Sequence, residues 1–297
     1  MKFRTQYSPE KGDLVLDPEK PIVFVGSCFS QNIASVMREH SWDSFLPLGT
    51  LYNPLSISLA IDLFCDIEKG KERFETSLYQ YNGIWNSSFL DSSFSSVRKE
   101  DCVEEFISRQ NQFIHSINQG KILIVTFGTS ICYFDTSTSD VVGNCHKLPS
   151  QNFYRRRLSI EEIVVNWKYL IEDLSRRFPG LNIIFTVSPV RHLKDGFTGN
   201  SHSKAVLQLA VEEICNSNFT CHYFPAYEIL NDDLRDYRFY ASDLCHPSEE
   251  AIEYIWENFI ETYLDQRGKK LLEEGLRQMK SANHRPKLGA LGKPLNL

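Results

Sequence analysis

Three short apolar runs, each separated from the next by helical patterns, constrain the fold more than any other feature of this sequence. The runs are residues 22–25, 122–127 and 183–187, and all three are rich in valine or isoleucine. Runs of this length and composition are typical of strands buried on both faces of a sheet. Because helices separate them, the strands should pair in parallel through right-handed crossovers. We therefore expect an α/β fold, a three-layer α/β/α sandwich around a mainly parallel sheet.

Capping signals indicate where several predicted helices begin. Six helices are expected to begin at about residues 31, 54, 102, 160, 201 and 247. Ser159 and Glu162 form a capping-box pattern, in which each side chain satisfies a backbone N–H group at the start of a helix. Pro54 and Pro247 suit the first turn of a helix, because proline lacks the N–H group that would go unpaired there.

The chain is predicted to form one domain over residues 1–265, followed by a basic C-terminal extension over residues 266–297. Within the domain, residues 68–100 show no clear periodicity, and we expect an irregular excursion that walls the site. The pair Asn82-Gly83 predicts a short hairpin inside it. The extension is expected to be a solvated tail with at most one helix.

Composition excludes several classes of function. The net charge of −6 gives no basic footprint, so we expect no nucleic-acid partner. No apolar run is long enough to cross a bilayer, and the first eight residues do not resemble a signal peptide. The eight cysteines are scattered, without a Cys-x-x-Cys pair, which favours reduced thiols in a cytoplasmic protein and predicts neither a metal nor another cofactor. The oligomeric state is not predicted.

A possible nucleophile follows the first apolar run. Gly26 lets the backbone turn tightly, and Ser27 and Cys28 come next, before a helix. A side chain at such a junction lies at the carboxyl edge of a parallel sheet, where open α/β folds bind ligands. It also faces a helix N-terminus, whose partial positive charge favours a thiolate. The plain alternative is a tight turn with a buried cysteine.

Asp243 and His246 provide the second half of a possible catalytic site. They are three residues apart, directly before the last strongly apolar helix, so one turn could aim both side chains at one place. A carboxylate orients an imidazole, and the imidazole can take a proton from a hydroxyl or a thiol. The structural alternative is an exposed Asp beside a His that caps the helix.

The sequence Gly-Ser-Cys-Phe-Ser at residues 26–30 resembles the signature of the GSCFA-domain family, which has Ala where this chain has Ser30. Further stretches resemble the same family: residues 52–56, 188–192, 203–205, 224–228, 235–240 and 243–248. The family is similar in turn to SGNH/GDSL-type hydrolases. The resemblance therefore implies a flavodoxin-like, SGNH-like sheet with the nucleophile after the first strand, and it matches the late Asp-x-x-His motif of those enzymes to Asp243 and His246.

One departure from the hydrolase pattern concerns the nucleophile. Those enzymes carry Gly-Asp-Ser, with the serine two places after the glycine. Here that place is Cys28, and Ser27 stands at the Asp position. The resemblance thus favours Cys28 as the attacking residue, with Ser27 as the alternative. A thiol near a helix N-terminus and a histidine should ionise readily and form a thioester, which suits acyl transfer as well as hydrolysis.

A second departure concerns the oxyanion hole. Related hydrolases use a Gly after the second strand, here Gly49, and an Asn after the third. At the second place this chain has Gly128 and Thr129, which offer donors but no Asn. The loss of one good donor can cost about 3 kcal/mol. Further residues expected to complete the pocket, each with a structural alternative, are Asn53, Arg191, His192 and Asn200.

Two functions of different classes follow. The first is a hydrolase or acyltransferase that acts on an ester, a small-molecule or glycan-linked acyl substrate, through Cys28 or Ser27 with His246 and Asp243. The second is a catalytically impaired ligand-binding module on the same fold, for which the missing Asn argues. A nucleotide-binding Rossmann protein is a poorer third choice, because Gly26 is not followed by further glycines.

Overall fold

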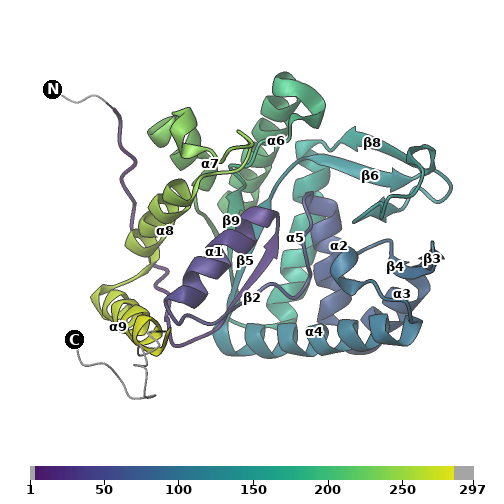
Figure 1. The fold of residues 1–297 in the computed structure, drawn as a ribbon, viewed down its shortest axis with the longest axis horizontal. Coiled ribbons are helices and arrows are strands. Elements are labelled where there is room, and N and C mark those ends of the chain that lie inside the picture. The colour runs from purple at the N-terminus through teal and green to yellow at the C-terminus, as the bar shows by residue number, and fades with distance from the viewer. Residues whose placement is uncertain (1–3, 284–297) are drawn as a thin grey trace, which may run out of the picture.

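A five-stranded parallel sheet forms the centre of the molecule (Figure 1). The computed structural model describes residues 4–283. The strands of the sheet are β1 (Ile22–Gly26), β2 (Ser44–Phe45), β5 (Ile122–Phe127), β9 (Asn182–Val187) and β10 (Cys221–Tyr223). Their order in space is β2-β1-β5-β9-β10. Strand β1 therefore lies between β2 and β5. This is the flavodoxin-like order, and its switch point lies between β1 and β5.

The register of the sheet aligns the ends of its central strands. Val25 pairs with Val125, and Thr126 pairs with Thr186, so β1, β5 and β9 end at nearly the same level. Chain segments that leave these three strands therefore start from one edge. The predicted α/β fold with a mainly parallel sheet is confirmed.

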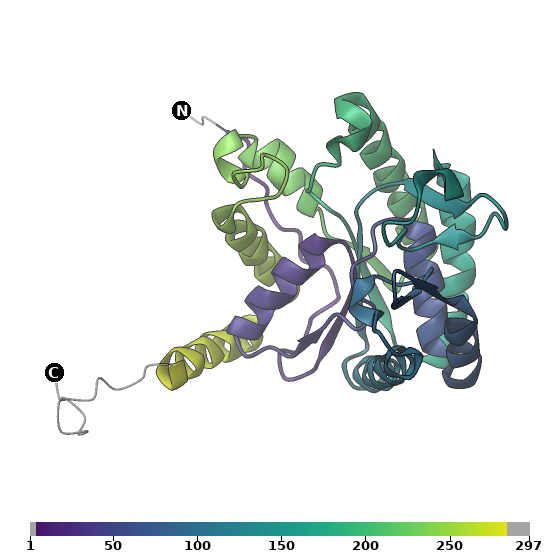
Figure 2. The same cartoon turned by 45° about the vertical axis from the view of Figure 1, so that its right-hand side comes forward.

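Helices cover both faces of the sheet (Figure 2). One face packs against α1 (Cys28–Glu39) and α8 (Glu249–Tyr263). The other packs against α2 (Pro54–Cys65), α4 (Lys99–Gly120), α5 (Ile160–Arg177) and α6 (Gly196–Ser217). Strand side chains alternate between these layers: Val23 and Val25 join the second face, whereas Ile22 and Phe24 join the first. Both sets are buried, which explains why the strands read as continuous apolar runs.

The region between residues 68 and 100 is more regular than its sequence suggested. It contains α3 (Ile67–Ser77), the hairpin β3 (Leu78–Tyr81) and β4 (Ile84–Ser87), and the short turn η1 (Ser92–Phe94). The hairpin turns at Asn82-Gly83 as predicted, because both residues adopt positive φ. The expectation of an irregular excursion is wrong for α3, whose polar sequence buries only Gly70 and Phe74 and so lacks a helical stripe.

A small antiparallel sheet follows β5, in a stretch for which the sequence predicted no strand. It consists of β6 (Ile131–Asp135), β7 (Val141–Val142) and β8 (Phe153–Arg157), preceded by the turn η2 (Ser150–Asn152). Four of the five residues of β8 are exposed, so the strand has no apolar alternation to reveal it. The sheet projects beyond the central layers beside α5 and α6 (Figure 1).

The C-terminal third of the chain consists mainly of helices and short helical turns. Short helical turns, η3 (Leu193–Asp195), α7 (Ala226–Glu228), η4 (Ile229–Leu234) and η5 (Tyr237–Phe239), connect the last strands to α8. Ser248 caps α8, so Pro247 precedes the helix rather than opening it. Helix α9 (Gln266–Asn283) is not a solvated tail over its described length, because Leu272 is buried in the core around α1 and α8. The rest of the predicted extension, residues 284–297, lies outside the described residues.

Candidate active site

The turn after β1 depends on a glycine at position 26. Gly26 has a φ of 123°, and a Cβ there would clash with the carbonyl oxygen of Thr126 on β5. Only glycine permits both the conformation and the close approach of the two strands. The chain then passes through Ser27, the N-cap residue, and Cys28 is the first residue of α1. The cysteine thus stands at the carboxyl end of β1, beside the switch point of the sheet.

Cys28, His246 and Asp243 form a continuous chain of contacts. The Sγ atom of Cys28 lies 3.5 Å from Nε2 of His246, although the two residues are 218 positions apart. Nδ1 of the same imidazole lies 2.6 Å from Oδ2 of Asp243. Because the Asp243 carboxylate accepts a hydrogen bond from Nδ1–H, the neutral imidazole presents an unprotonated Nε2 to the thiol.

The carboxylate of Asp243 is itself fixed by the loop that carries it. Its Oδ1 atom accepts the backbone N–H groups of Cys245 and His246, each at 2.9 Å. These bonds, and then the bond to the imidazole, lower the pKa of Asp243 to about 2. The residue therefore remains an anion at any pH at which the protein is expected to work, which suits it to orient His246.

Ser27 is the neighbour of Cys28, but its side chain takes no part in the contacts that link Cys28, His246 and Asp243. Its side chain is 1% exposed, and its Oγ atom has no hydrogen-bond partner among the described residues. Cys28 is more accessible, and it is the residue that meets the imidazole. The two possible nucleophiles thus have different surroundings.

The expectation that the Cys28 thiol ionises readily is not met by its surroundings. Burial raises the pKa of the thiol, and the backbone N–H groups of Phe29 and Cys28 offset this rise only in part. The resting side chain is therefore a thiol. A base must remove its proton when it reacts, and Nε2 of His246 is in place to do so.

Gly128, His192 and Tyr52 lie beside Ser27 in the turn after β1. A Cβ at position 128 would lie 3.2 Å from Nε2 of His192 and 3.3 Å from Cβ of Ser27 and from the Tyr52 ring. Glycine thus allows these groups to converge on the turn after β1. The ring of Tyr52 meets the His192 ring edge to face, at a centroid distance of 5.7 Å. His192 thus lies next to Gly128 and Tyr52, close to the turn that carries Ser27.

The imidazole of His192 is held in its neutral form. Burial, and then the positive charge of Lys204, lower its pKa to about 4. Its Nε2 atom is buried and has no hydrogen-bond partner in the described part of the chain. A buried polar atom without a partner is costly, so this nitrogen is available to a group that enters the site.

With this geometry in place, comparison with known proteins identifies the family. The sequence matches the GSCFA family over residues 21–259, a range that includes both Cys28 and His246. The chain belongs to the GSCFA family. No curated protein matches the sequence.

Several solved structures align with this GSCFA chain. A candidate platelet-activating factor from Streptococcus pneumonia aligns at 10% identity and a TM-score of 0.43, covering 84% of this chain and 85% of the other. A candidate acylhydrolase from Bacteroides fragilis aligns at 10% identity and a TM-score of 0.40, covering 91% and 92%. A family two carbohydrate esterase from Clostridium thermocellum, in complex with cellohexaose, aligns at 14% identity and a TM-score of 0.38, covering 82% and 63%.

Three of the predicted pocket residues use their side chains for internal bonds. Oδ1 of Asn53 accepts the N–H group of Ser56, so this residue is the N-cap of α2. Oδ1 of Asn200 accepts the backbone N–H group of His192. Oγ1 of Thr129 shares a hydrogen bond with a serine of α6. Each of these side chains therefore supports the site from outside the Cys28–His246 contact.

The backbone amides after β5 are also occupied. The N–H groups of Gly128 and Thr129 both donate to the carbonyl oxygen of Tyr52, at 2.8 and 3.0 Å. They cannot donate to a ligand at the same time without breaking these bonds. Gly49 lies in the loop after β2, with a φ of 70° and the carboxylate of Asp91 packed where a Cβ would be. The structure thus shows why position 49 requires glycine, and it places an anion beside it.

Arg191 links the two loops that carry the histidines. Its backbone N–H group donates to the carbonyl oxygen of Cys245 at 3.1 Å. Its guanidinium lies over the rings of Tyr240 and Tyr237, at 4.1 and 5.2 Å from their centroids. The residue thus fixes the loop that carries His192 to the loop that carries His246.

Lys204 lies next to Gly128 and Ser188, and it is not among the site residues predicted from the sequence. Its side chain is almost completely buried, and its Nζ atom donates to the carbonyl oxygens of Gly128 and Ser188, each at 2.6 Å. A lysine among the inward-facing positions of α6 was the available signal, because lysine is almost never fully buried without a partner.

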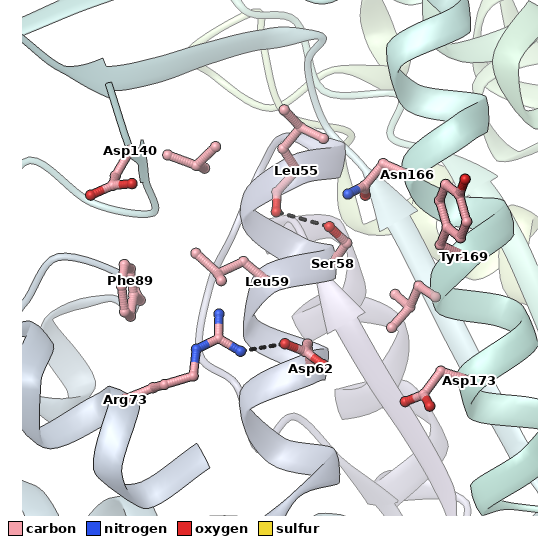
Figure 3. A pocket seen from close by; sticks show the side chains of 12 residues that line it. Leu55, Ser58, Leu59, Asp62, Arg73, Phe89, Asp140, Asn166, Tyr169 and Asp173 are labelled. Carbon is pink, nitrogen blue, oxygen red and sulfur yellow. Dashed lines mark hydrogen bonds and ion pairs between the residues drawn. The ribbon is translucent and has the colours of Figure 1, made fainter. Parts of the chain in front are cut away.

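A separate cavity lies between α2, α3, α5 and the loop after β6 (Figure 3). It has a volume of about 550 Å³, and its lining contains neither cysteine nor histidine. Two of its charged residues pair with each other, since Arg73 binds Asp62. Residues 4–283 contain no cluster of His, Cys, Asp and Glu able to hold a metal, and no helix within that range is long and apolar enough to span a bilayer.

Proposed function

We propose that this GSCFA protein is a thiol-dependent esterase or acyltransferase in which Cys28 attacks the acyl carbonyl of an ester. The observation that carries the proposal is the chain of contacts from the Cys28 thiol through His246 to Asp243. A nucleophile, a base within reach and a group that orients the base are the parts that covalent acyl transfer requires.

The first half of the reaction forms a thioester. Nε2 of His246 takes the thiol proton while Sγ of Cys28 bonds to the acyl carbon, and the carbonyl oxygen gains the negative charge. The resulting imidazolium is stabilised by the anionic carboxylate of Asp243. Collapse of the tetrahedral intermediate breaks the ester bond, and the imidazolium returns the proton to the leaving alcohol.

The second half regenerates the thiol. A water molecule, or the hydroxyl group of an acceptor, gives its proton to His246 and attacks the thioester carbonyl. Expulsion of the sulfur, which recovers its proton from the His246 imidazolium, releases an acid or a new ester. Hydrolysis and transfer therefore share every residue and differ only in what occupies the site at this step.

His192 is proposed as a donor to the oxyanion, in place of the Asn that related hydrolases use. Its pKa of about 4 keeps the imidazole neutral, and its Nε2 has no other partner. A neutral imidazole protonated at Nε2 can donate one hydrogen bond to a developing negative charge. The backbone N–H group of Cys28, at the first helical position of α1, is the second donor.

Turnover of a panel of esters, including nitrophenyl esters and acetylated sugars, tests this proposal. The wild-type protein is expected to release acid or transfer the acyl group, and Cys28→Ala should lower the rate by about a thousandfold or more. Ser27→Ala is the matched control and should keep most of the activity. Equal activity of the wild-type protein and Cys28→Ala would contradict the mechanism.

A second candidate is a binding module that retains the site without turnover. The occupied N–H groups of Gly128 and Thr129 favour it, because they leave fewer oxyanion donors than a hydrolase of this type would have. Labelling with an electrophilic thiol reagent and a fluorophosphonate distinguishes the two. Selective reaction at Cys28 that disappears in His246→Ala supports the enzyme, whereas reaction no faster than at the other cysteines supports the binding module.

A further inference from the structure

Most side chains that line the cavity between α2 and α5 come from one face of each helix (Figure 3). On α2 the lining residues run from Leu55 to Asp62, and on α5 they run from Asn166 to Asp173. In both helices they follow the i, i+3, i+4, i+7 spacing of a single face. The space that they line has a volume of about 550 Å³, which lies within the range of small-molecule sites. We call this space the α2–α5 groove.

The amide of Asn166 brings an unused hydrogen-bonding atom to the groove. Its Oδ1 atom is buried, and it has no hydrogen-bond partner within residues 4–283. A buried acceptor without a donor lowers stability, and the same amide carries two further donors on its nitrogen. A ligand group that suits this side chain should therefore both donate and accept hydrogen bonds, as a hydroxyl group does.

Most charged residues of the groove are already paired. Arg73 forms an ion pair with Asp62, and Asp173 pairs with two arginines of its own helix at 2.6 and 3.2 Å. Asp140 is exposed and forms no ion pair with another described residue. The described lining thus offers no free base to an anion and one free carboxylate to hydroxyl donors. This balance favours a ligand without net charge.

Aromatic and aliphatic side chains complete the lining. Tyr169 on α5 is 71% exposed, and Phe89 follows β4. Figure 3 shows these two rings on opposite sides of α2, with Leu55 and Leu59 between them. A ligand for such a lining needs apolar faces as well as hydroxyl groups. A sugar ring has both, because its C–H bonds point to its faces and its hydroxyl groups point outward.

We propose that the α2–α5 groove is a binding site for a neutral saccharide. Hydroxyl groups of the sugar bind the Asn166 amide and the Asp140 carboxylate, and a face of its ring packs against Tyr169. This binding goes beyond the proposed function, because no residue that acts in the proposed mechanism lines the groove.

The groove begins close to the active site without sharing its residues. Leu55, at the upper end of the groove in Figure 3, follows Tyr52 by three residues, and three residues of extended chain span about 10 Å at most. Tyr52 in turn contacts His192. A saccharide in the groove therefore lies near the site proposed for acyl transfer, but outside it.

Isothermal titration calorimetry of the full chain with neutral oligosaccharides tests the proposal. The probes are cellopentaose, xylopentaose, maltopentaose and chitopentaose, none of which carries an ester that the protein could cleave. At least one of them is expected to bind with a Kd of about 1 mM or lower. Spermine, a polycation, is the control for the free carboxylate and should bind more weakly.

Two substitutions in the groove should weaken the binding. Tyr169→Ala removes the exposed ring and Asn166→Ala removes the amide, and each is expected to raise Kd about tenfold. Tyr169→Phe keeps the ring and should bind like the unsubstituted protein. Phe219→Ala is the matched control, because Phe219 is 93% exposed and lies outside the groove, so its substitution should leave Kd unchanged.

Three results would overturn the proposal: no binding of any oligosaccharide in the panel, binding that neither Tyr169→Ala nor Asn166→Ala weakens, or tighter binding of spermine than of every saccharide. The Tyr169 side chain is mostly exposed, so its variants should fold normally, which thermal unfolding checks. Because these measurements involve no acyl transfer, a protein that binds a saccharide in the groove but turns over no ester would refute the proposed function and leave this inference standing.

Discussion

The loop over residues 188–195 and the loop over residues 241–248 each bring one histidine to the turn after β1, but they treat the imidazole in opposite ways. His246 has a side chain 45% exposed and a carboxylate on Nδ1. His192 is partly buried, its Nε2 has no partner, and its pKa is lowered to about 4. The first environment allows a proton to be taken up and returned. The second holds an imidazole neutral, and this difference supports the proposed roles of His246 as the base and His192 as the donor.

The largest expected effect separates the two histidines directly. His246→Ala removes the base and should lower the rate of ester turnover by about a thousandfold, within the range that general acid–base catalysis supplies. His192→Ala removes one oxyanion donor and should lower kcat by about a hundredfold, with little change in KM. Steady-state kinetics of both variants measures this. If His192→Ala were the more damaging variant, the two roles would be reversed.

His246 has a carboxylate on its Nδ1 atom, that of Asp243, whereas His192 has none, so the next test removes the charge of Asp243. Asp243→Asn keeps the shape of the side chain but offers Nδ1 an amide in place of an anion. We expect turnover to fall by about a hundredfold, while alkylation of Cys28 at alkaline pH is unchanged because the thiol is then already ionised. An activity equal to that of the wild-type protein would remove Asp243 from the mechanism.

The low pKa of His192 predicts a pH dependence of the stability of the fold. Below about pH 6.5 the unfolded chain takes up a proton at this imidazole, whereas the folded protein does so only near pH 4. Acidification over that window should therefore cost on the order of 2 kcal/mol of unfolding free energy at this one residue. His192→Gln should lose that part of the pH dependence in urea unfolding measured between pH 4.5 and 7. Parallel curves for the two proteins would show that His192 titrates normally.

The smallest effect concerns the link between the loops. Arg191→Ala keeps the backbone bond to Cys245 but removes the guanidinium from the rings of Tyr240 and Tyr237. A loss of about 1 kcal/mol in unfolding free energy is expected, with Arg191→Lys intermediate. Thermal unfolding of the three proteins tests this. A stability unchanged in Arg191→Ala would mean that the backbone bond alone holds the loops together.

The sequence predicted the parts of the fold that are locally consistent. The buried strands β1, β5 and β9 correspond to the three apolar runs of the sequence. The capping box predicted at Ser159 and Glu162 is present at the start of α5. Helix α3 and strand β8 were missed, because their sequences are mostly polar and their stability comes from tertiary packing rather than from a local pattern. Strands β6 and β7 were also missed, although their residues are mostly apolar.

The candidate site was predictable only in part, for a similar reason. The strand–turn–helix junction and the Asp-x-x-His spacing indicated Cys28, His246 and Asp243. Spacing could not show that the Asn53 and Asn200 side chains bond within the protein, nor that the amides after β5 bind Tyr52. The surroundings of His192 and Lys204 depend on burial in the folded chain, which no local pattern encodes. Burial also raises the thiol pKa that the helix N-terminus was expected to lower.

Intact-protein mass spectrometry after incubation with a thioester or activated-ester donor tests the central claim most directly. We predict one acyl group per chain, located on Cys28, released by hydroxylamine at neutral pH and absent from Cys28→Ala and His246→Ala. The same mass increase in Cys28→Ala, with the acyl group on Ser27, would contradict the assignment of the nucleophile. No adduct on either residue with any donor would contradict covalent catalysis at this site.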